Sequence, residues 1–123
     1  MQRLAGKTVF ITGIGGGMGR QAALTFTREG AKVVGCDLFE EPANETVALV
    51  RAAGGEITSF GGVNLSDAEA TKKWIEAALQ VYGGCDVLYN NASTPKFGDV
   101  DELSVEDWDF VMDNELNLVF YAC

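Results

Sequence analysis

The sequence contains no histidine, and it has only two prolines and three cysteines among its 123 residues. The absence of histidine removes the usual metal ligand and the usual general base of enzymes. The cysteines are odd in number and widely scattered, at Cys36, Cys85 and Cys123. Since they show no spacing typical of a metal site or a disulfide framework, we predict no metal site and a location in the reducing cytoplasm.

Basic residues and long apolar runs are also scarce. Nine lysines and arginines stand against 18 acidic residues, which gives a formal net charge of −9. This charge argues against nucleic acid or an anionic membrane as a partner. No apolar run approaches the length of a membrane span, and the N-terminus lacks the layout of a signal peptide. A chain of 123 residues forms at most one domain.

Glycine, in contrast, is abundant, and it is concentrated in the stretch Thr12-Gly13-Ile14-Gly15-Gly16-Gly17-Met18-Gly19. An apolar run precedes this stretch and helix-forming residues follow it, which predicts a strand, a tight loop and a helix. Glycines permit positive φ and let the backbone approach a bulky anion. A helix that starts near Gly17 directs unpaired N–H groups and a partial positive charge into the loop. The loop therefore suits a phosphate or pyrophosphate, with a flexible turn of an α/β unit as the alternative.

Strand and helix patterns alternate along the rest of the chain. We expect strands at residues 7–12, 32–37, 56–63 and 86–90, and helices at residues 17–29, 42–53, 66–82 and from 104 onward. Ser66, with Glu69 three residues later, and Ser104 are the predicted helix caps. The predicted inner face of the first helix carries Met18, Ala22 and Phe26. That of the third helix carries Ala70, Trp74, either Ala77 or Ala78, and Val81. That of the last helix carries Trp108, Val111, Met112, Leu116 and Val119. Strict alternation predicts an α/β fold with a doubly wound parallel sheet of the Rossmann type.

Two motifs at a characteristic separation indicate a family. The sequence Thr12-Gly13-x-x-x-Gly17-x-Gly19 is followed by Asp37, which completes a dinucleotide fingerprint, and then by Asn90-Asn91-Ala92. This order resembles the short-chain dehydrogenase/reductase family, whose cofactor motif is TGxxxGxG and whose fourth strand ends in NNAG. The resemblance implies a dinucleotide-binding domain over residues 1–123, a nicotinamide cofactor, a homo-oligomer, and hydride transfer between a small secondary alcohol and its ketone.

The resemblance also implies which residues bind the cofactor. Asp37 would accept hydrogen bonds from the adenosine ribose, Asn64 and Leu65 would lie at the adenine, and Asn90 and Ala92 would line the nicotinamide ribose. Asn90 and Asn91 have a structural alternative that is compatible with this role, which is to tie the strand end to its neighbours. The complete predicted set is Thr12, Gly13, Ile14, Gly17, Met18, Gly19, Asp37, Asn64, Leu65, Asn90 and Ala92.

The charge around Asp37 favours NAD over NADP. A carboxylate at this position would repel a 2′-phosphate. No lysine or arginine stands at Gly16, Leu38 or Phe39, where a phosphate-binding cation would be expected.

Three departures from the family pattern matter for activity. Ser93 replaces the glycine that usually follows Asn-Asn-Ala, and Glu115 stands where the family has the asparagine of its proton relay. Asn114 is the alternative relay residue, and an exposed helix position without a relay role is the alternative for Glu115. No tyrosine of the chain is followed four residues later by lysine, so the Ser and Tyr-x-x-x-Lys of the family are missing. We therefore expect a domain that is incomplete at its C-terminus after about four strands, with little or no turnover. The rival interpretation is a non-catalytic NAD-binding or dimerising module.

Overall fold

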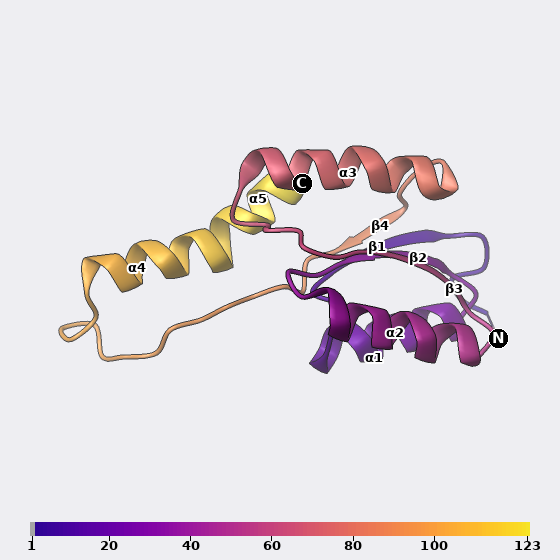
Figure 1. The fold of residues 1–123 in the computed structure, drawn as a ribbon, viewed down its shortest axis with the longest axis horizontal. Helices are drawn as coiled ribbons and strands as arrows, with labels where there is room; N and C mark the ends of the chain where they lie inside the picture. Colours follow the sequence, from indigo (N-terminus) through magenta and orange to yellow (C-terminus); the bar gives the residue numbers. More distant parts are fainter. Residues whose placement is uncertain (1) are drawn as a thin grey trace.

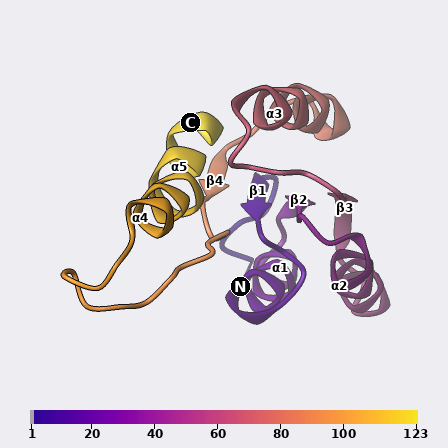
Figure 2. The ribbon, with the colours of Figure 1, turned by 60° about the vertical axis from the view of Figure 1, so that its left-hand side comes forward.

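A computed structural model describes residues 2–123. Its centre is a parallel sheet of four strands in the order β3-β2-β1-β4. The strands are β1 (Thr8–Thr12), β2 (Lys32–Cys36), β3 (Glu56–Phe60) and β4 (Val87–Tyr89). Helices α1 (Gly17–Arg28) and α2 (Glu40–Ala52) lie on one face, and α3 (Ala68–Tyr82) lies on the other (Figures 1 and 2). This arrangement confirms the predicted doubly wound α/β fold.

The central strands of the sheet, β1 and most of β2, are buried on both faces. All five residues of β1 are buried, as expected for a central parallel strand with helices on either side. Because side chains alternate along a strand, Val9 and Ile11 belong to the cluster under α1 and α2, whereas Phe10 belongs to the cluster under α3. The Phe10 ring packs against Trp74 of α3, with centroids 5.9 Å apart.

The strand order places a topological switch point beside β1. The chain builds β1, β2 and β3 outward in one direction and then crosses the sheet to place β4 on the other side of β1. Val9 of β1 pairs with Val33 of β2 on one side and with Val87 of β4 on the other. Ligands of doubly wound proteins bind at the carboxyl ends of the strands at such a point.

The predicted cap of α3 is wrong by one residue. Asp67 is the N-cap, because its Oδ1 accepts a hydrogen bond from the Ala70 amide at 2.9 Å. Ser66 is engaged elsewhere: its amide and its hydroxyl donate to Asn64 Oδ1 at 3.1 and 2.7 Å. This local turn consumes the hydroxyl that was expected to cap the helix.

The predicted inner face of α1 is partly wrong. Met18 is 73% exposed, and the buried residues of the helix are Gly19 and Ala23. Ala22 and Phe26 are half-buried at the edge of the core. In α3 the buried face is Thr71, Trp74 and Ala78.

The last helical stretch is not one continuous α-helix. It consists of α4 (Val105–Val111), the π-helical segment η1 (Met112–Asn117) and α5 (Leu118–Ala122). The predicted cap Ser104 is confirmed, since its Oγ accepts from the Asp107 amide at 3.0 Å. Two residues of the predicted inner face, Trp108 and Leu116, are more than half exposed.

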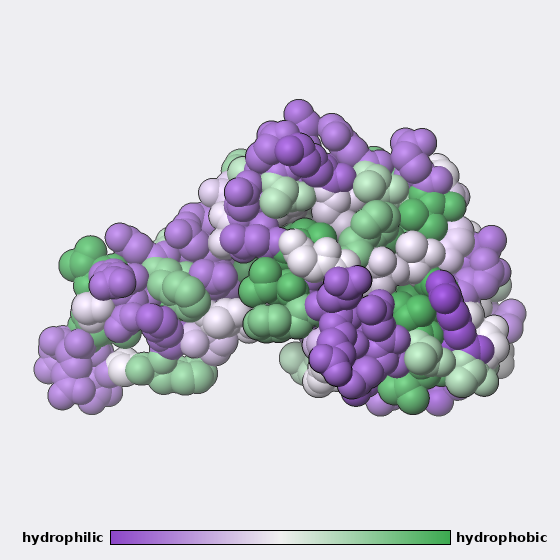
Figure 3. Space-filling view, viewed as in Figure 1, coloured by the Kyte–Doolittle hydropathy of each residue, from purple (hydrophilic) through white to green (hydrophobic). Residues whose placement is uncertain are grey.

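Residues 90–104 and α4 form an arm that extends away from the sheet (Figures 1 and 3). In contrast, α5 returns to lie beside α3 (Figure 1). Leu118 and Ala122 of α5 are buried, so α5 anchors the arm to the body. Within residues 2–123 no helix is both long and apolar enough to cross a membrane.

Candidate functional site

A pocket of about 450 Å³ lies at the carboxyl ends of the strands. Its volume is in the range typical of small-molecule sites. The glycine loop, the turn after β2, the loop after β3, the segment after β4 and η1 all contribute to its wall. Most predicted cofactor residues line it, namely Gly13, Gly17, Met18, Asp37, Asn64, Leu65 and Ala92.

Three other predicted residues lie behind the loop and shape it. Thr12 is fully buried, and its Oγ1 accepts from the amides of Asn91 and Ala92 at 2.9 Å each. Ile14 is fully buried in the core cluster beneath α1 and α2. A Cβ on Gly19 would lie 2.0 Å from the Gly13 carbonyl oxygen.

The glycine loop is shaped to expose backbone amides. Gly13 has φ +70°, and a Cβ there would lie 3.0 Å from Ala92 Cα. A Cβ on Gly16 or Gly17 would meet nothing within 4 Å, so these positions border open space. Gly16 is the N-cap of α1 and supplies no side-chain cap, and the first turn carries no acidic residue. The amide groups at this helix end are therefore available to an anion.

The Asp37 carboxylate is held in place by two backbone amides. Its Oδ2 accepts from the Gly15 amide at 2.8 Å, and its Oδ1 accepts from the Phe39 amide at 2.9 Å. Each carboxylate oxygen can accept a further hydrogen bond from a ligand. Gly15 must remain small, because a Cβ there would lie 2.7 Å from Asp37 Oδ2. No lysine or arginine among the described residues lines the pocket.

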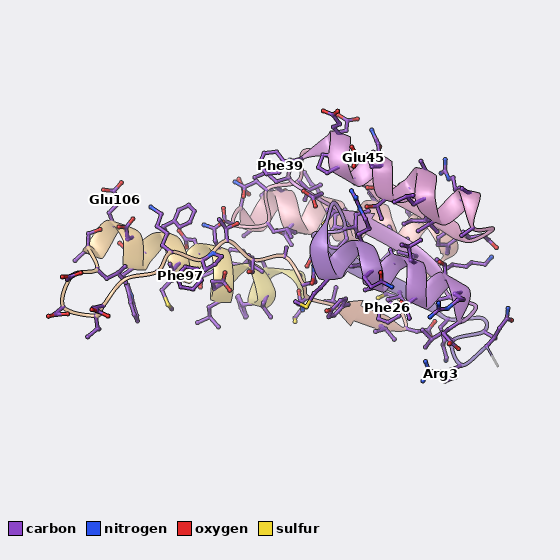
Figure 4. All side chains as sticks on the ribbon, turned by 90° about the horizontal axis from the view of Figure 1, so that it is seen from below. Arg3, Phe26, Phe39, Glu45, Phe97 and Glu106 are labelled. Carbon is purple, nitrogen blue, oxygen red and sulfur yellow. The ribbon has the colours of Figure 1, made fainter. Side chains whose placement is uncertain are left out.

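Apolar and small polar residues outside the predicted cofactor-binding set complete the wall. Leu38, Phe39 and Val63 lie beside Asp37 and Asn64, and Ser66, Ser93 and Thr94 add hydroxyl groups. Phe39 is 65% exposed at the start of α2 (Figure 4). Their positions in the segments that follow β2, β3 and β4 are the only signal that could have indicated them from the sequence.

Asn91, rather than Asn90, lines the pocket. Its Nδ2 donates to the carbonyl oxygens of Thr12 and Gly13 at 3.1 and 3.2 Å. The Asn90 side chain is directed elsewhere: its Nδ2 lies 3.8 Å from Cys123 Sγ, and its Oδ1 is buried without a partner among residues 2–123. Side chains alternate at the strand end, so these two neighbours point in different directions. The sequence alone did not determine which of the two asparagines faces the pocket.

Of the two candidate relay residues, Asn114 reaches the pocket and Glu115 does not. Asn114 lies in η1, and its side-chain Nδ2 donates to the backbone carbonyl of Phe110 at 2.9 Å. The backbone carbonyl of Asn114 accepts from the Thr94 amide at 3.4 Å. Glu115 Oε1 is buried without a partner among the described residues. The family pattern indicated Glu115 by its distance along the sequence from Trp108. Both candidates lie in a π-helical segment, where a turn holds one more residue than an α-helical turn.

Neither the buried thiol of Cys36 nor the acidic groups form a second centre among the described residues. Burial raises the pKa of the Cys36 thiol far above its ordinary value, and the neighbouring Asp37 carboxylate raises it further. No group of three histidine, cysteine, aspartate or glutamate side chains within residues 2–123 is placed to hold a metal ion.

Comparison with known proteins agrees with the geometry of the pocket. The family model described as short chain dehydrogenase matches residues 7–123. The chain belongs to the short-chain dehydrogenase family.

Individual members of the family resemble the chain over most of its length. An uncharacterized oxidoreductase of Thermotoga maritima is 40% identical over 87% of this chain and 41% of its own. A 2,5-dichloro-2,5-cyclohexadiene-1,4-diol dehydrogenase LinX of Sphingobium indicum is 43% identical over 86% of this chain and 42% of its own. The crystal structure of a short chain dehydrogenase from Mycobacterium avium superposes with a TM-score of 0.92 at 34% identity, over 99% of this chain and 45% of that one. The chain thus spans less than half the length of these relatives.

Proposed function

We propose that this chain is the cofactor-binding half of an NAD-dependent short-chain dehydrogenase. The observation that carries the proposal is the Asp37 carboxylate, which two backbone amides hold at the rim of a pocket that contains no cationic side chain among the described residues. Such a carboxylate accepts hydrogen bonds from ribose hydroxyls and repels a phosphate on the 2′-oxygen. The same pair of features supports NAD over NADP.

Different parts of the pocket would bind different parts of the dinucleotide. The amides of Gly16 and Gly17 at the start of α1 would hold the pyrophosphate, as helix N-termini do. Asn64 and the apolar Leu38, Val63 and Leu65 would hold the adenine ring. Asn91 and Ala92 would lie beside the nicotinamide ribose. When bound, NAD supplies a hydride acceptor.

The reaction that the full-length enzyme would catalyse is oxidation of a secondary alcohol or reduction of its ketone. The relative named for a cyclic diol supports an alcohol of similar class as substrate. Asn114 would hold a water at the pocket through its side-chain oxygen, because its amide nitrogen is already engaged. The sequence holds no Tyr-x-x-x-Lys, so we expect little or no turnover from residues 1–123 alone. The enzymatic names of the relatives weigh against a purely non-catalytic module.

Calorimetry with NAD and NADP tests the proposal. The wild-type chain should bind NAD more tightly than NADP. Asp37→Ala should weaken NAD binding about ten- to hundredfold, since hydrogen bonds to a charged group contribute about 1.5–3 kcal/mol each. Asp37→Ala should also reduce the ratio of the affinity for NAD to the affinity for NADP. Glu41→Ala, an exposed substitution on α2 outside the pocket, is the matched control. Equal or tighter binding of NADP by the wild type would contradict the proposal.

A further inference from the structure

Arg20 joins the glycine loop to α2. It is the fourth residue of α1, and its guanidinium group is partly buried. Its Nη2 donates to the Gly15 carbonyl at 2.7 Å, and Nη2 also lies 3.2 Å from the Pro42 carbonyl and 3.0 Å from the Glu45 carboxylate. Its Nε donates to Thr46 Oγ1 at 2.9 Å. The planar guanidinium presents its donors in a fixed fork, so these contacts set the distance between the loop and α2, where Figure 4 labels Glu45.

Thr46 makes the next contact along the same loop. Its side chain is fully buried in α2, and its hydroxyl donates to the Ile14 carbonyl at 2.7 Å. Two successive carbonyls of the loop, those of Ile14 and Gly15, are therefore bonded to side chains that do not line the pocket. Such an arrangement fixes the rotation of two neighbouring peptide planes.

The orientation of a carbonyl determines where the next amide points. In a trans peptide the C=O of one residue and the N–H of the next point in opposite directions, and none of the described peptides is cis. The Ile14 carbonyl faces Thr46, and the Gly15 amide accordingly faces Asp37 Oδ2. By the same geometry, the Gly15 carbonyl faces Arg20, so the Gly16 amide faces the opposite side.

The Gly16 amide is the first of the loop that is left for a ligand. The amides of Gly13 and Ile14 both donate to the Cys36 carbonyl, at 2.8 and 3.2 Å, and the Gly15 amide donates to Asp37. Gly16 lines the pocket, and a Cβ on it would meet nothing within 4 Å.

We infer that Arg20 and Thr46 are positioning residues of the nucleotide site, each responsible for one peptide plane. Thr46 orients the 14–15 peptide, whose amide holds the ribose-binding carboxylate of Asp37. Arg20 orients the 15–16 peptide, whose amide binds the pyrophosphate. Neither side chain touches the nucleotide. This assignment rests on the proposed function. It makes Thr46 responsible for the ribose end of the nucleotide site and Arg20 for the pyrophosphate end.

The division predicts a selective effect on two ligands, adenosine and ADP, measured by NMR titration. Arg20→Gln should weaken ADP binding about tenfold and leave adenosine binding within about twofold of wild type, because only ADP has a pyrophosphate. Thr46→Val should weaken both ligands, because both contain the ribose that Asp37 holds. It should weaken ADP at least as much as adenosine, because it also removes the acceptor of Arg20 Nε. Arg28→Gln, at the exposed far end of the same helix, should change neither.

The comparison separates positioning from general support of the fold. If Arg20→Gln lowers both affinities equally, or neither, the assignment of Arg20 is overturned. If Arg20→Gln does not fold, Arg20→Lys keeps the charge but loses the fork, and it should show the same selective loss of ADP. If the wild-type chain binds neither ligand, the proposed function fails instead.

The positioning role can also be measured without a nucleotide. Thr46→Val should speed hydrogen exchange of the Gly15 amide about tenfold, because the 14–15 peptide is then free to rotate away from Asp37. Arg20→Gln should shift the amide resonance of Gly16 more than that of Gly13, which donates to Cys36. An unchanged Gly15 exchange rate, or equal shifts at Gly13 and Gly16, would overturn the assignment.

Discussion

At the scale of single residues, the glycines of the loop fall into two kinds. Gly13 and Gly19 are required by close contacts with neighbouring backbone, whereas Gly16 and Gly17 border open space. Gly16 is extended, with φ −174°, a conformation that any residue can adopt. The first kind preserves the shape of the loop, and the second kind leaves room at the pocket.

Substitution by alanine should distinguish these two kinds. Gly19→Ala should destabilise the fold by about 3 kcal/mol or more, because its Cβ would overlap the Gly13 carbonyl and Asn91 Nδ2. Gly16→Ala should lower the free energy of unfolding by no more than about 1 kcal/mol, since alanine is a poorer N-cap than glycine and its Cβ meets no neighbour. Urea denaturation of both variants measures the difference. Equal stability of the two variants would contradict the assignment of Gly19 to loop packing.

Asp107 gives a pH dependence at the same scale. A hydrogen bond from Lys96 holds the pKa of the Asp107 carboxyl below its ordinary value, and Ser104 lowers it further. The Lys96 ammonium also lies over the Phe110 ring, 4.6 Å from its centroid. These contacts fasten the loop of residues 90–104 along α4, beside the labelled Phe97 in Figure 4.

Because the folded pKa of Asp107 is lowered, its contribution to stability is present above the unfolded pKa of about 3.9 and is lost as the pH falls through the lower folded value. NMR titration of the carboxyl carbon should give a pKa below that of an unperturbed aspartate. Lys96→Gln should raise it toward the ordinary value. An unchanged pKa in Lys96→Gln would mean that the ion pair does not form in solution.

At the scale of helices and strands, the order of elements follows from the alternation of the sequence, but several local choices do not. Apolar runs and glycines located the four strands and the first three helices to within a few residues, whereas the last helical stretch was expected as one continuous helix. The cap of α3 was wrong because Ser66 and Asp67 are both good caps, and only the turn at Asn64 decides between them. The π-helical segment was missed because no residue pattern marks an extra residue in a helical turn. Asn114, which lines the pocket, lies in this segment.

The cap of α3 can be tested by paired substitutions. Asp67→Ala should reduce the free energy of unfolding by about 1 kcal/mol, since it removes the side-chain acceptor for the Ala70 amide. Ser66→Ala should have a smaller effect, because it removes only the hydrogen bond to Asn64 in an exposed turn. Thermal unfolding followed by circular dichroism measures both. A larger loss in Ser66→Ala would restore the original prediction.

At the scale of the whole molecule, apolar side chains of the arm and of α5 are left exposed. Trp108, Leu116 and Phe120 are 53%, 56% and 77% exposed, and Val105 near the tip is 78% exposed. Several large apolar side chains on one helical stretch are more than an isolated surface residue, and they are typical of a surface that another protein covers.

We therefore expect the chain to associate with itself as its concentration rises. Sedimentation at increasing concentrations should show an increasing average mass, and the pair Leu116→Lys and Phe120→Lys should reduce it. Leu49→Lys, at a 47% exposed position on α2 away from the arm, serves as the control. A monomer at every concentration would contradict this expectation.

The central claim is that NAD occupies the pocket at the carboxyl ends of the strands and is recognised there by Asp37. The most direct measurement is a map of amide resonances of the ¹⁵N-labelled chain as NAD is added. We predict that the amides of Gly16, Gly17, Asp37, Asn64 and Ala92 shift in a saturable way, while those of Arg28, Lys72 and Glu106 stay in place. In Asp37→Ala the same amides should shift only at higher NAD concentration. Shifts confined to the arm, or no saturable shift at all, would contradict the account.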